Sequence, residues 1–278
     1  MTTPDTLSIS IETHFHEKKK MIYRIYQTII LAPLLVLTTA FGGSIATVIC
    51  PCASWLKRHL PFSLGIFTQP DWWASALSRC WARIIVRASL LPVKVYGREN
   101  IPPHTSCVFV ANHQGAYDIF LVCGFLNMEI RWVMKRSLEK IPFLGTASRH
   151  AGYIFVDKGN PGKVRATYRH AEEALKDGAS VMIFPEGSRT FDGHMTQFRR
   201  GAFTLADELQ LPVVPLTING SFDVLPRQKD GEYITHHPLT LTIHKPIYPL
   251  SKGTDNINRL LNESYKVINA AVEEKYRN

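Results

Sequence analysis

The sequence predicts an α/β fold: a mixed, largely parallel sheet covered by helices, with an N-terminal membrane-associated helical segment. Two observations lead to this prediction. From about Pro92 onward, short β-rich runs alternate with helical stretches, as in strands joined by covering helices. Before that point, Thr28 to Cys52 carries no charge over 25 residues, and a bilayer core needs only ~20. We therefore divide the chain into an N-terminal anchoring segment, residues 1–91, and an α/β domain, residues 92–278.

Basic residues flank the uncharged run on both sides, and no Asp or Glu occurs between Lys18 and Pro70. A spanning helix usually carries its basic excess on the cytoplasmic side only. Pro33 and the Gly42-Gly43 pair also interrupt the run. These features favour a re-entrant or in-plane helical hairpin, with both ends on the cytoplasmic face. A single straight span and a buried soluble helix are the alternatives.

Tryptophan is concentrated just after this run. Four of the five tryptophans fall within 27 residues: Trp55, Trp72, Trp73 and Trp81. Trp is enriched where membrane meets water, and basic residues nearby attract anionic lipids. The cluster therefore predicts anchors for an anionic lipid surface. The alternative is a Trp-rich core helix with a solvated basic face.

Hydrophobic runs and their punctuation predict the elements of the α/β domain. The expected strands are Val93–Tyr96, Ser106–Ala111, Ile130–Met134, Ala151–Val156, Ala179–Phe184, Val213–Ile218 and Leu239–His244. The expected helices are Ala116–Leu126, Pro161–Lys176, Gly201–Glu208 and Asp255–Tyr276.

The formal net charge of +9 predicts an anionic partner: nucleic acid, an acidic membrane or a phosphorylated substrate. The uncharged run and the lack of a recognised binding motif argue against nucleic acid. The five cysteines form no C-x-x-C pair, so we expect reduced, packed thiols and no metal site.

The candidate catalytic residues are His113 and Asp118, which follow an expected strand and open an expected helix. A five-residue spacing would separate them by about 140° on a regular helix. With His113 in the turn, however, the Asp118 carboxylate can reach one imidazole nitrogen and leave the other to accept a proton from a hydroxyl. Backbone N–H groups near the helix start are candidate oxyanion donors.

A second motif, Phe184-Pro185-Glu186-Gly187-Ser188-Arg189-Thr190, follows another apolar strand. Arg189 offers the planar donor fork that holds phosphate. Glu186 is expected to orient that arginine or bond a substrate hydroxyl. Lys158, at the end of a further expected strand, can add a second phosphate contact, and Pro215 can shape a wall against an apolar chain.

This combination resembles the glycerolipid acyltransferase family, of the 1-acyl-glycerol-3-phosphate acyltransferase type. That family has four ordered blocks. Here they are matched by His113 with Asp118 as its H-x4-D motif, by Gly152–Lys158, by Phe184–Arg189 and by Val214–Leu216. The resemblance covers roughly residues 92–247. The second block commonly ends in Arg, and here it ends in Lys158, which keeps the charge but lacks the bidentate fork.

The resemblance implies an enzyme that moves a fatty-acyl group from acyl-CoA or acyl-carrier protein to the sn-2 hydroxyl of 1-acyl-glycerol-3-phosphate. It implies catalysis by His113 and Asp118, and acceptor binding by Lys158, Glu186, Gly187 and Arg189, with neither cofactor nor metal. The expected location is the cell membrane, with the catalytic domain on the cytoplasmic face. Alternatives are another acceptor, such as glycerol-3-phosphate or lyso-ornithine lipid, and an inactive membrane scaffold.

Overall fold

A seven-stranded sheet forms the centre of the molecule in the computed structural model, which describes residues 4–59, 70–156, 169, 171–173, 175, 178–229 and 232–278. The strand order is β1-β7-β6-β2-β5-β3-β4, and every neighbouring pair is parallel except β6 and β7. The strands are β1 Val93–Tyr96, β2 Val108–Ala111, β3 Ile130–Lys135, β4 Ile154–Val156, β5 Ser180–Ile183, β6 Val213–Asn219 and β7 Leu239–Ile243. The predicted mixed, largely parallel sheet is confirmed, and all seven expected strands are present.

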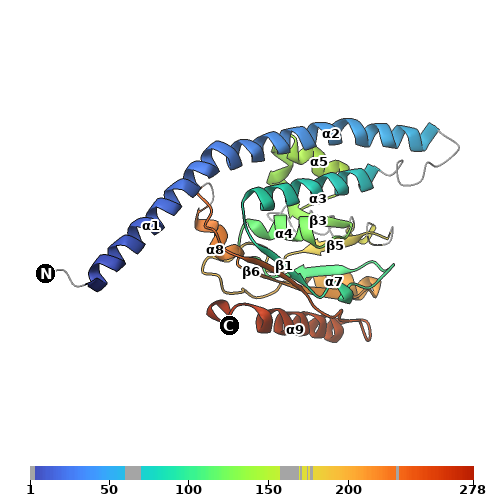
Figure 1. Ribbon diagram of the computed structural model, residues 1–278. Helices are drawn as coiled ribbons and strands as arrows, with labels where there is room; N and C mark the ends of the chain where they lie inside the picture. The colour runs from blue at the N-terminus through green and yellow to red at the C-terminus, as the bar shows by residue number, and fades with distance from the viewer. Residues whose placement is uncertain are drawn as a thin grey trace.

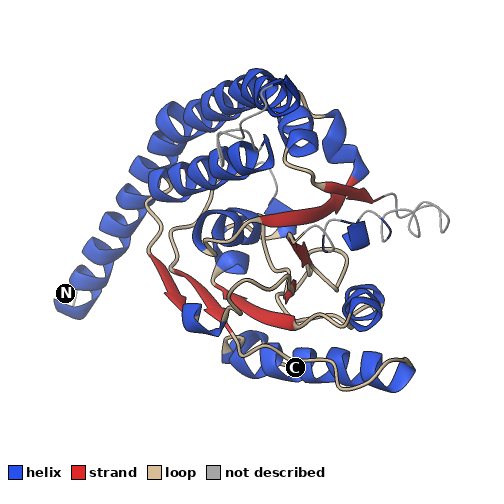
Figure 2. Cartoon of the chain, turned by 90° about the vertical axis from the view of Figure 1, so that its right-hand side faces the viewer, coloured by secondary structure: helices blue, strands red, loops and turns tan. Residues whose placement is uncertain are grey.

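Helices cover both faces of this sheet (Figures 1 and 2). Beyond the N-terminal rod, the helices are α3 Pro70–Ala88, α4 Tyr117–Phe125, α5 Leu144–His150, α7 Gly201–Leu209, α8 Ser221–Val224 and α9 Thr254–Ala271. Short 3-10 helices occupy Arg98–Asn100, Arg136–Lys140, Arg227–Lys229 and Glu274–Tyr276. The expected helix Asp255–Tyr276 is thus divided after Ala271. The expected helix Pro161–Lys176 lies largely outside the described residues, although 169, 171–173 and 175 are helical.

The core has two parts because the central strands are buried on both faces. In β2, Phe109 and Ala111 join the cluster formed with α3 and α4, whereas Val108 and Val110 join the cluster formed with α7 and α9. All four β2 side chains are fully buried. This two-sided burial explains why the strands appear in the sequence as unbroken apolar runs.

The N-terminal segment is one long helical rod with a bend. Its parts are α1 Pro4–Tyr26, a π-helical turn Gln27–Leu31 and α2 Ala32–His59. In the turn, the Ala32 N–H donates to the carbonyl of Gln27, five residues back. Pro33 lacks the N–H that the next α-helical bond would need, which explains a bulge at this position. α1 projects away from the body beyond this bend (Figure 1).

The prediction of a hairpin inside the uncharged run is wrong, because residues 28–52 are helical throughout. The rod continues through Gly42-Gly43, and the two antiparallel helices of this region are α2 and α3 (Figure 1). Residues Thr13–Ile49 are long and apolar enough to cross a membrane by length and composition. Many of their apolar side chains are exposed, including Ile29, Val36 and Phe41.

The tryptophans do not all face outward. Trp81 packs against the core and its ring contacts Phe120, while its indole N–H donates to Thr39 of α2 at 3.1 Å. Trp73 packs in a small cluster between α2 and α3, whereas Trp55 is 57% exposed. The core alternative therefore holds for Trp81 and Trp73. The side chain of Trp72 lies outside the described part of the structure.

The cysteines also divide into two groups. Cys107 and Cys123 are buried free thiols, as expected. Cys52 and Cys80 are free but exposed, so the prediction that every thiol is packed is wrong for these two. The side chain of Cys50 lies outside the description.

Candidate active site

The first and third sequence motifs meet at one edge of the sheet. β2 and β5 are neighbouring parallel strands, with Val110 opposite Ile183. The loops that follow them, which carry His113 and residues 184–190, therefore lie side by side. The Thr190 N–H donates to the His113 carbonyl oxygen at 2.9 Å. Ligand sites in open α/β sheets occur at this carboxyl edge.

His113 and Asp118 form the predicted contact. His113 Nδ1 lies 2.7 Å from Asp118 Oδ2. The contact is possible because His113 lies in the loop and Asp118 in the first turn of α4. The same Oδ2 accepts the backbone N–H groups of Gln114 and Gly115, at 2.7 and 3.0 Å. Because Asp118 Oδ2 accepts hydrogen bonds here, the tautomer that fits this contact has its hydrogen on Nδ1 and a lone pair on Nε2.

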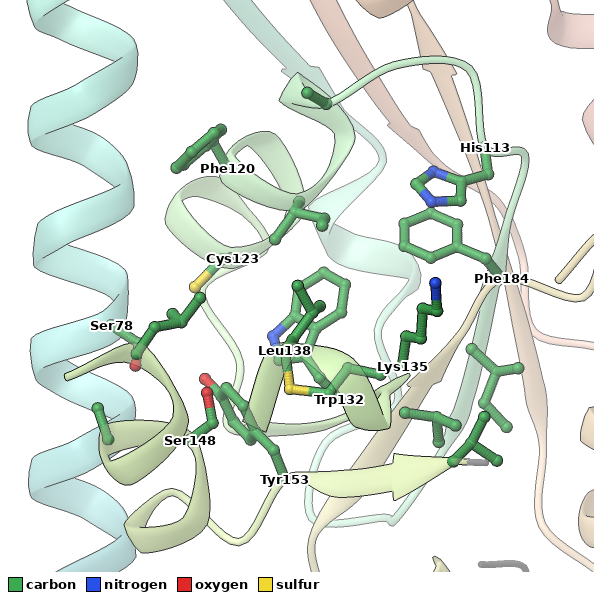
Figure 3. A pocket seen from close by; sticks show the side chains of 18 of the residues that line it. Ser78, His113, Phe120, Cys123, Trp132, Lys135, Leu138, Ser148, Tyr153 and Phe184 are labelled. Atoms are coloured by element: carbon green, nitrogen blue, oxygen red, sulfur yellow. The ribbon is translucent and has the colours of Figure 1, made fainter. Parts of the chain in front are cut away.

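The imidazole ring is held on its face as well as at its edge. It stacks on Phe184, with ring centroids 3.9 Å apart and planes 11° from parallel. Phe184 is itself supported by Trp132. The His113 side chain is 14% exposed and borders the cavity shown in Figure 3. Stacking and the hydrogen bond to Asp118 together define the direction of Nε2.

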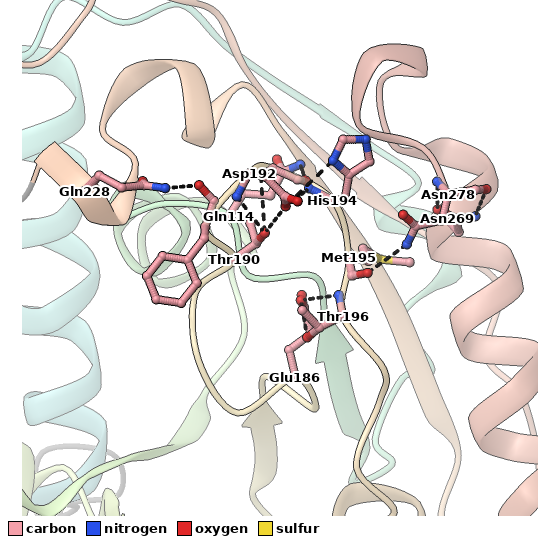
Figure 4. A network of polar contacts seen from close by, with 12 residues as sticks. Gln114, Glu186, Thr190, Asp192, His194, Met195, Thr196, Gln228, Asn269 and Asn278 are labelled. Carbon is pink, nitrogen blue, oxygen red and sulfur yellow. Dashed lines mark hydrogen bonds and ion pairs between the residues drawn. The ribbon is translucent and has the colours of Figure 1, made fainter.

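Glu186 supports the backbone of the His113 loop. Its Oε1 accepts the His113 N–H at 2.7 Å, and its Oε2 accepts the N–H and the hydroxyl of Thr196 at 2.8 and 2.9 Å (Figure 4). Burial raises the pKa of this carboxyl to about 7, although the hydrogen bonds from Thr196 and His113 act against that rise. We expected Glu186 to orient Arg189 or to bond a substrate hydroxyl. Its hydrogen bonds instead hold the loop that carries His113, one residue of the His113–Asp118 dyad.

The backbone N–H groups near the start of α4 are already engaged. Those of Gln114 and Gly115 donate to Asp118, and that of Ala116 donates to the Leu225 carbonyl at 3.1 Å. The expectation that amides at this helix start bind an oxyanion is therefore wrong for these three.

A cavity of about 800 Å³ opens beside His113 (Figure 3). Its inner part lies between α2, α3, α4 and the β3–β4 region. Side chains that are mostly apolar line this part, among them Ala46, Leu77, Phe120, Cys123, Trp132, Leu138, Phe143 and Tyr153. Such a lining suits a long hydrocarbon chain, because apolar surface gains free energy when it leaves water.

Cations line the same cavity. They are Lys135, Arg189, Arg199 and Arg227, and no Asp or Glu of the described chain lines it. Gly187 makes room for one of them: it has a φ of +77°, and a Cβ there would lie 3.0 Å from the Arg199 Nε. Glycine is therefore favoured both by the backbone conformation and by the guanidinium packed over it.

The remaining predicted residues have different outcomes. Lys158 lies outside the described residues. Pro215 lies in β6 opposite Val110, buried in the sheet, so it is not the expected cavity wall. Lys135, which the sequence reasoning missed, ends β3, and Figure 3 shows its amine directed toward Phe184 and His113. Its position after an apolar strand is the same signal that selected Lys158.

Comparison with known proteins gives the family. Residues 92–219 match the family model described as Acyltransferase. The 1-acyl-sn-glycerol-3-phosphate acyltransferase of Pseudomonas aeruginosa is 32% identical over 192 residues, which cover 68% of this chain and 70% of that protein. The chain belongs to this acyltransferase family.

Other acyltransferases agree. A chloroplastic 1-acyl-sn-glycerol-3-phosphate acyltransferase of Brassica napus is 34% identical over 62% of this chain and 49% of its own length. The alignments thus span about half the length of the chloroplast relatives. The crystal structure of the 1-acyl-sn-glycerophosphate (LPA) acyltransferase PlsC from Thermotoga maritima has a TM-score of 0.65 and 25% identity. That similarity covers 84% of this chain and 92% of that one.

Proposed function

We propose that this acyltransferase moves a fatty-acyl group from a thioester to the sn-2 hydroxyl of 1-acyl-glycerol-3-phosphate, forming phosphatidate and a free thiol. The observation that carries the proposal is the His113–Asp118 dyad at a cavity that is apolar on one side and cationic on the other. The relatives named above support the choice of acceptor.

The chemistry follows from the orientation of the imidazole. His113 Nε2 accepts the proton of the sn-2 hydroxyl, and the oxygen attacks the thioester carbonyl carbon. The C–S bond breaks as the tetrahedral intermediate collapses, and the departing sulfur takes the proton from Nε2. Asp118 holds the ring in one tautomer and stabilises the imidazolium that forms between these steps. Neither a cofactor nor a metal enters this scheme.

Acceptor binding needs a cation for its phosphate and room for its acyl chain. Arg189 and Lys135 line the cavity beside the dyad and supply the charge. Lys158 remains a predicted additional contact. Arg189→Ala should therefore raise the acceptor KM about tenfold or more, with a smaller change in the donor KM. The opposite pattern would reverse the assignment of the two substrates.

The N-terminal rod is the proposed membrane contact. Its exposed apolar side chains and the basic residues before them suit a lipid surface whose headgroups are anionic. The inner cavity lies directly beneath α2, where Gly42 and Ala46 border it. A lysophospholipid could therefore pass between bilayer and site without crossing water. We place the protein at the cell membrane, with the catalytic domain on the cytoplasmic face.

The decisive experiment is thioester release by detergent-purified protein. The donor is acyl-CoA or, separately, acyl-carrier protein, each with and without 1-acyl-glycerol-3-phosphate. The rate of thiol release should fall at least ~10²-fold in His113→Ala. His150→Ala, which changes a histidine on α5, should keep the wild-type rate. Acceptor-dependent release that survives in His113→Ala would contradict the mechanism. Without release in the presence of 1-acyl-glycerol-3-phosphate, glycerol-3-phosphate and lyso-ornithine lipid would be supplied in turn. Release with either would change the acceptor, and folded protein with no release from any of the three would favour the inactive scaffold.

A further inference from the structure

The cavity holds more cationic charge than a lysophospholipid phosphate requires. A phosphate monoester carries about −1.5 to −2 charges at neutral pH. Arg189 and Lys135 already match that charge. Arg199 and Arg227 are two further exposed guanidinium groups at the same cavity, and neither forms an ion pair with any residue that the structure describes. The surplus suggests a second anionic group at this mouth.

An exposed aromatic ring lies next to one of these arginines. The Arg227 guanidinium sits 4.4 Å from the ring centroid of Phe191, which is 63% exposed. A large apolar side chain at that exposure has room for a second planar group on its open face. Phe191 is also held in place, because Gln228 donates a hydrogen bond to its carbonyl oxygen.

Both residues are attached directly to the catalytic loop. Thr190, next to Phe191, donates its N–H to the His113 carbonyl. Pro226, next to Arg227, forms a β-bridge with Gly115. Asp192, which follows Phe191 in the chain, is turned toward its own loop, where its carboxylate accepts from the Thr190 hydroxyl and the His194 N–H. The rim beside the dyad therefore combines an aromatic face with two guanidinium groups, Arg199 and Arg227, that pair with no acid among the described residues.

We propose that Phe191, Arg227 and Arg199 form a nucleotide site for the acyl donor, which is then a coenzyme A thioester. This inference rests on the proposed function. Adenine can stack on Phe191, while the guanidinium groups bind the diphosphate and the ribose 3′-phosphate. The pantetheine arm, which is flexible, then reaches from the rim to His113. A carrier-protein donor has no base for Phe191 and a single phosphodiester on its arm, so it leaves the rim unused.

The test compares donors that share one acyl group: acyl-CoA, acyl-pantetheine, which lacks the nucleotide, and acyl-carrier protein. Phe191→Ala and Arg227→Ala should each raise the KM for acyl-CoA about tenfold. They should leave the KM for acyl-pantetheine and for the lysophospholipid within about twofold. Lys229→Ala removes a positive charge from the same 3-10 turn, outside the cavity lining, and is the matched control.

A binding measurement separates this inference from the proposed function. Adenosine 3′,5′-diphosphate, titrated into the full chain in detergent, should bind wild type and Lys229→Ala but bind Arg227→Ala at least tenfold more weakly. If wild type released no thiol yet bound this nucleotide, the reaction would be wrong and the site right. Equal KM changes for acyl-CoA and acyl-pantetheine would overturn the site. The site would also be overturned if either variant raised the KM for acyl-carrier protein alone. The same holds if Phe191→Ala bound vesicles more weakly while its KM for acyl-CoA was unchanged.

Discussion

Replacing Asp118 with Asn tests how much of the catalytic rate depends on one negative charge. The two oxygens of this buried carboxylate have different surroundings. Oδ2 accepts from His113 Nδ1, Gln114 N–H and Gly115 N–H, whereas Oδ1 is buried and has no hydrogen-bond partner among the described residues. In Asp118→Asn, the amide oxygen must take the Oδ2 position, since an NH2 group there would face three donors. The tautomer of His113 is therefore kept, and only the charge is lost.

The size of the loss follows from Coulomb's law. The imidazolium that forms during the reaction would lie about 4 Å from the carboxylate charge, which is worth roughly 4 kcal/mol at an effective dielectric constant of about 20. Each 1.36 kcal/mol is a factor of ten in rate, so kcat should fall about 10³-fold. Acceptor KM should change little, because Asp118 is fully buried and is not among the residues that line the cavity.

The assay is acceptor-dependent thiol release at saturating substrates, with thermal unfolding of each protein measured alongside. Asp255→Asn, an exposed residue in the first turn of α9, is the matched control and should retain full activity. A fall of less than about threefold in folded Asp118→Asn would refute the electrostatic reasoning. A large fall accompanied by unfolding would leave Asp118 as a structural residue that holds the loop amides.

Three further outcomes are expected. The folded-state pKa of Glu186 is raised from 4.5 to about 7, so the protonated carboxyl stabilises the fold at low pH, and this stability is lost as pH rises through 7. Between pH 5 and 8, the free energy of unfolding of wild type should therefore fall by about 3 kcal/mol more than that of Glu186→Gln. Denaturant unfolding at each pH measures the difference. Gln27→Ala leaves both backbone groups of buried Ile234 unpaired, and should lower the free energy of unfolding by about 2–4 kcal/mol. Gly42 borders the cavity and has no atom within 4 Å of a Cβ position, so Gly42→Leu should slow transfer of long acyl chains about tenfold more than short ones.

The strands of this fold were predictable because their signal is local. Each is a short apolar run, and burial on both faces keeps such runs free of polar residues. The order of strands was not predictable in this way. β7 returns antiparallel to β6 yet parallel to β1, a choice set by contacts far apart in the chain. The same limit explains the wrong prediction for Pro215. Its sequence context does not reveal that β6 lies between two other strands, which buries this residue in the sheet.

The dyad was foreseeable for a different reason. His113 and Asp118 are close in sequence, so a loop followed by a helix start brings them together whatever the rest of the chain does. The partners of Glu186, in contrast, are 73 and 10 residues away, and nothing in its own motif indicates that it accepts the His113 N–H. Lys135 was missed because a strand ending in a single charge is common, and only the shared cavity distinguishes it.

The predicted boundary near residue 91 divides the chain clearly by amino-acid composition, but the two parts pack together in the structure. α3, which precedes it, contributes Ala82 and Val86 to the core of the sheet. The rod is joined to the site as well: the Gln27 side chain bonds both backbone groups of Ile234, Thr235 donates to the Val224 carbonyl, and Leu225 accepts from Ala116. These bonds, with the short backbone segments that join them, form a path from the bend of the N-terminal rod to the start of α4. We expect a change at the bend to reach the helix that carries Asp118 through these hydrogen bonds and the two short backbone segments between them, which gives the Gln27→Ala variant a second readout in kcat.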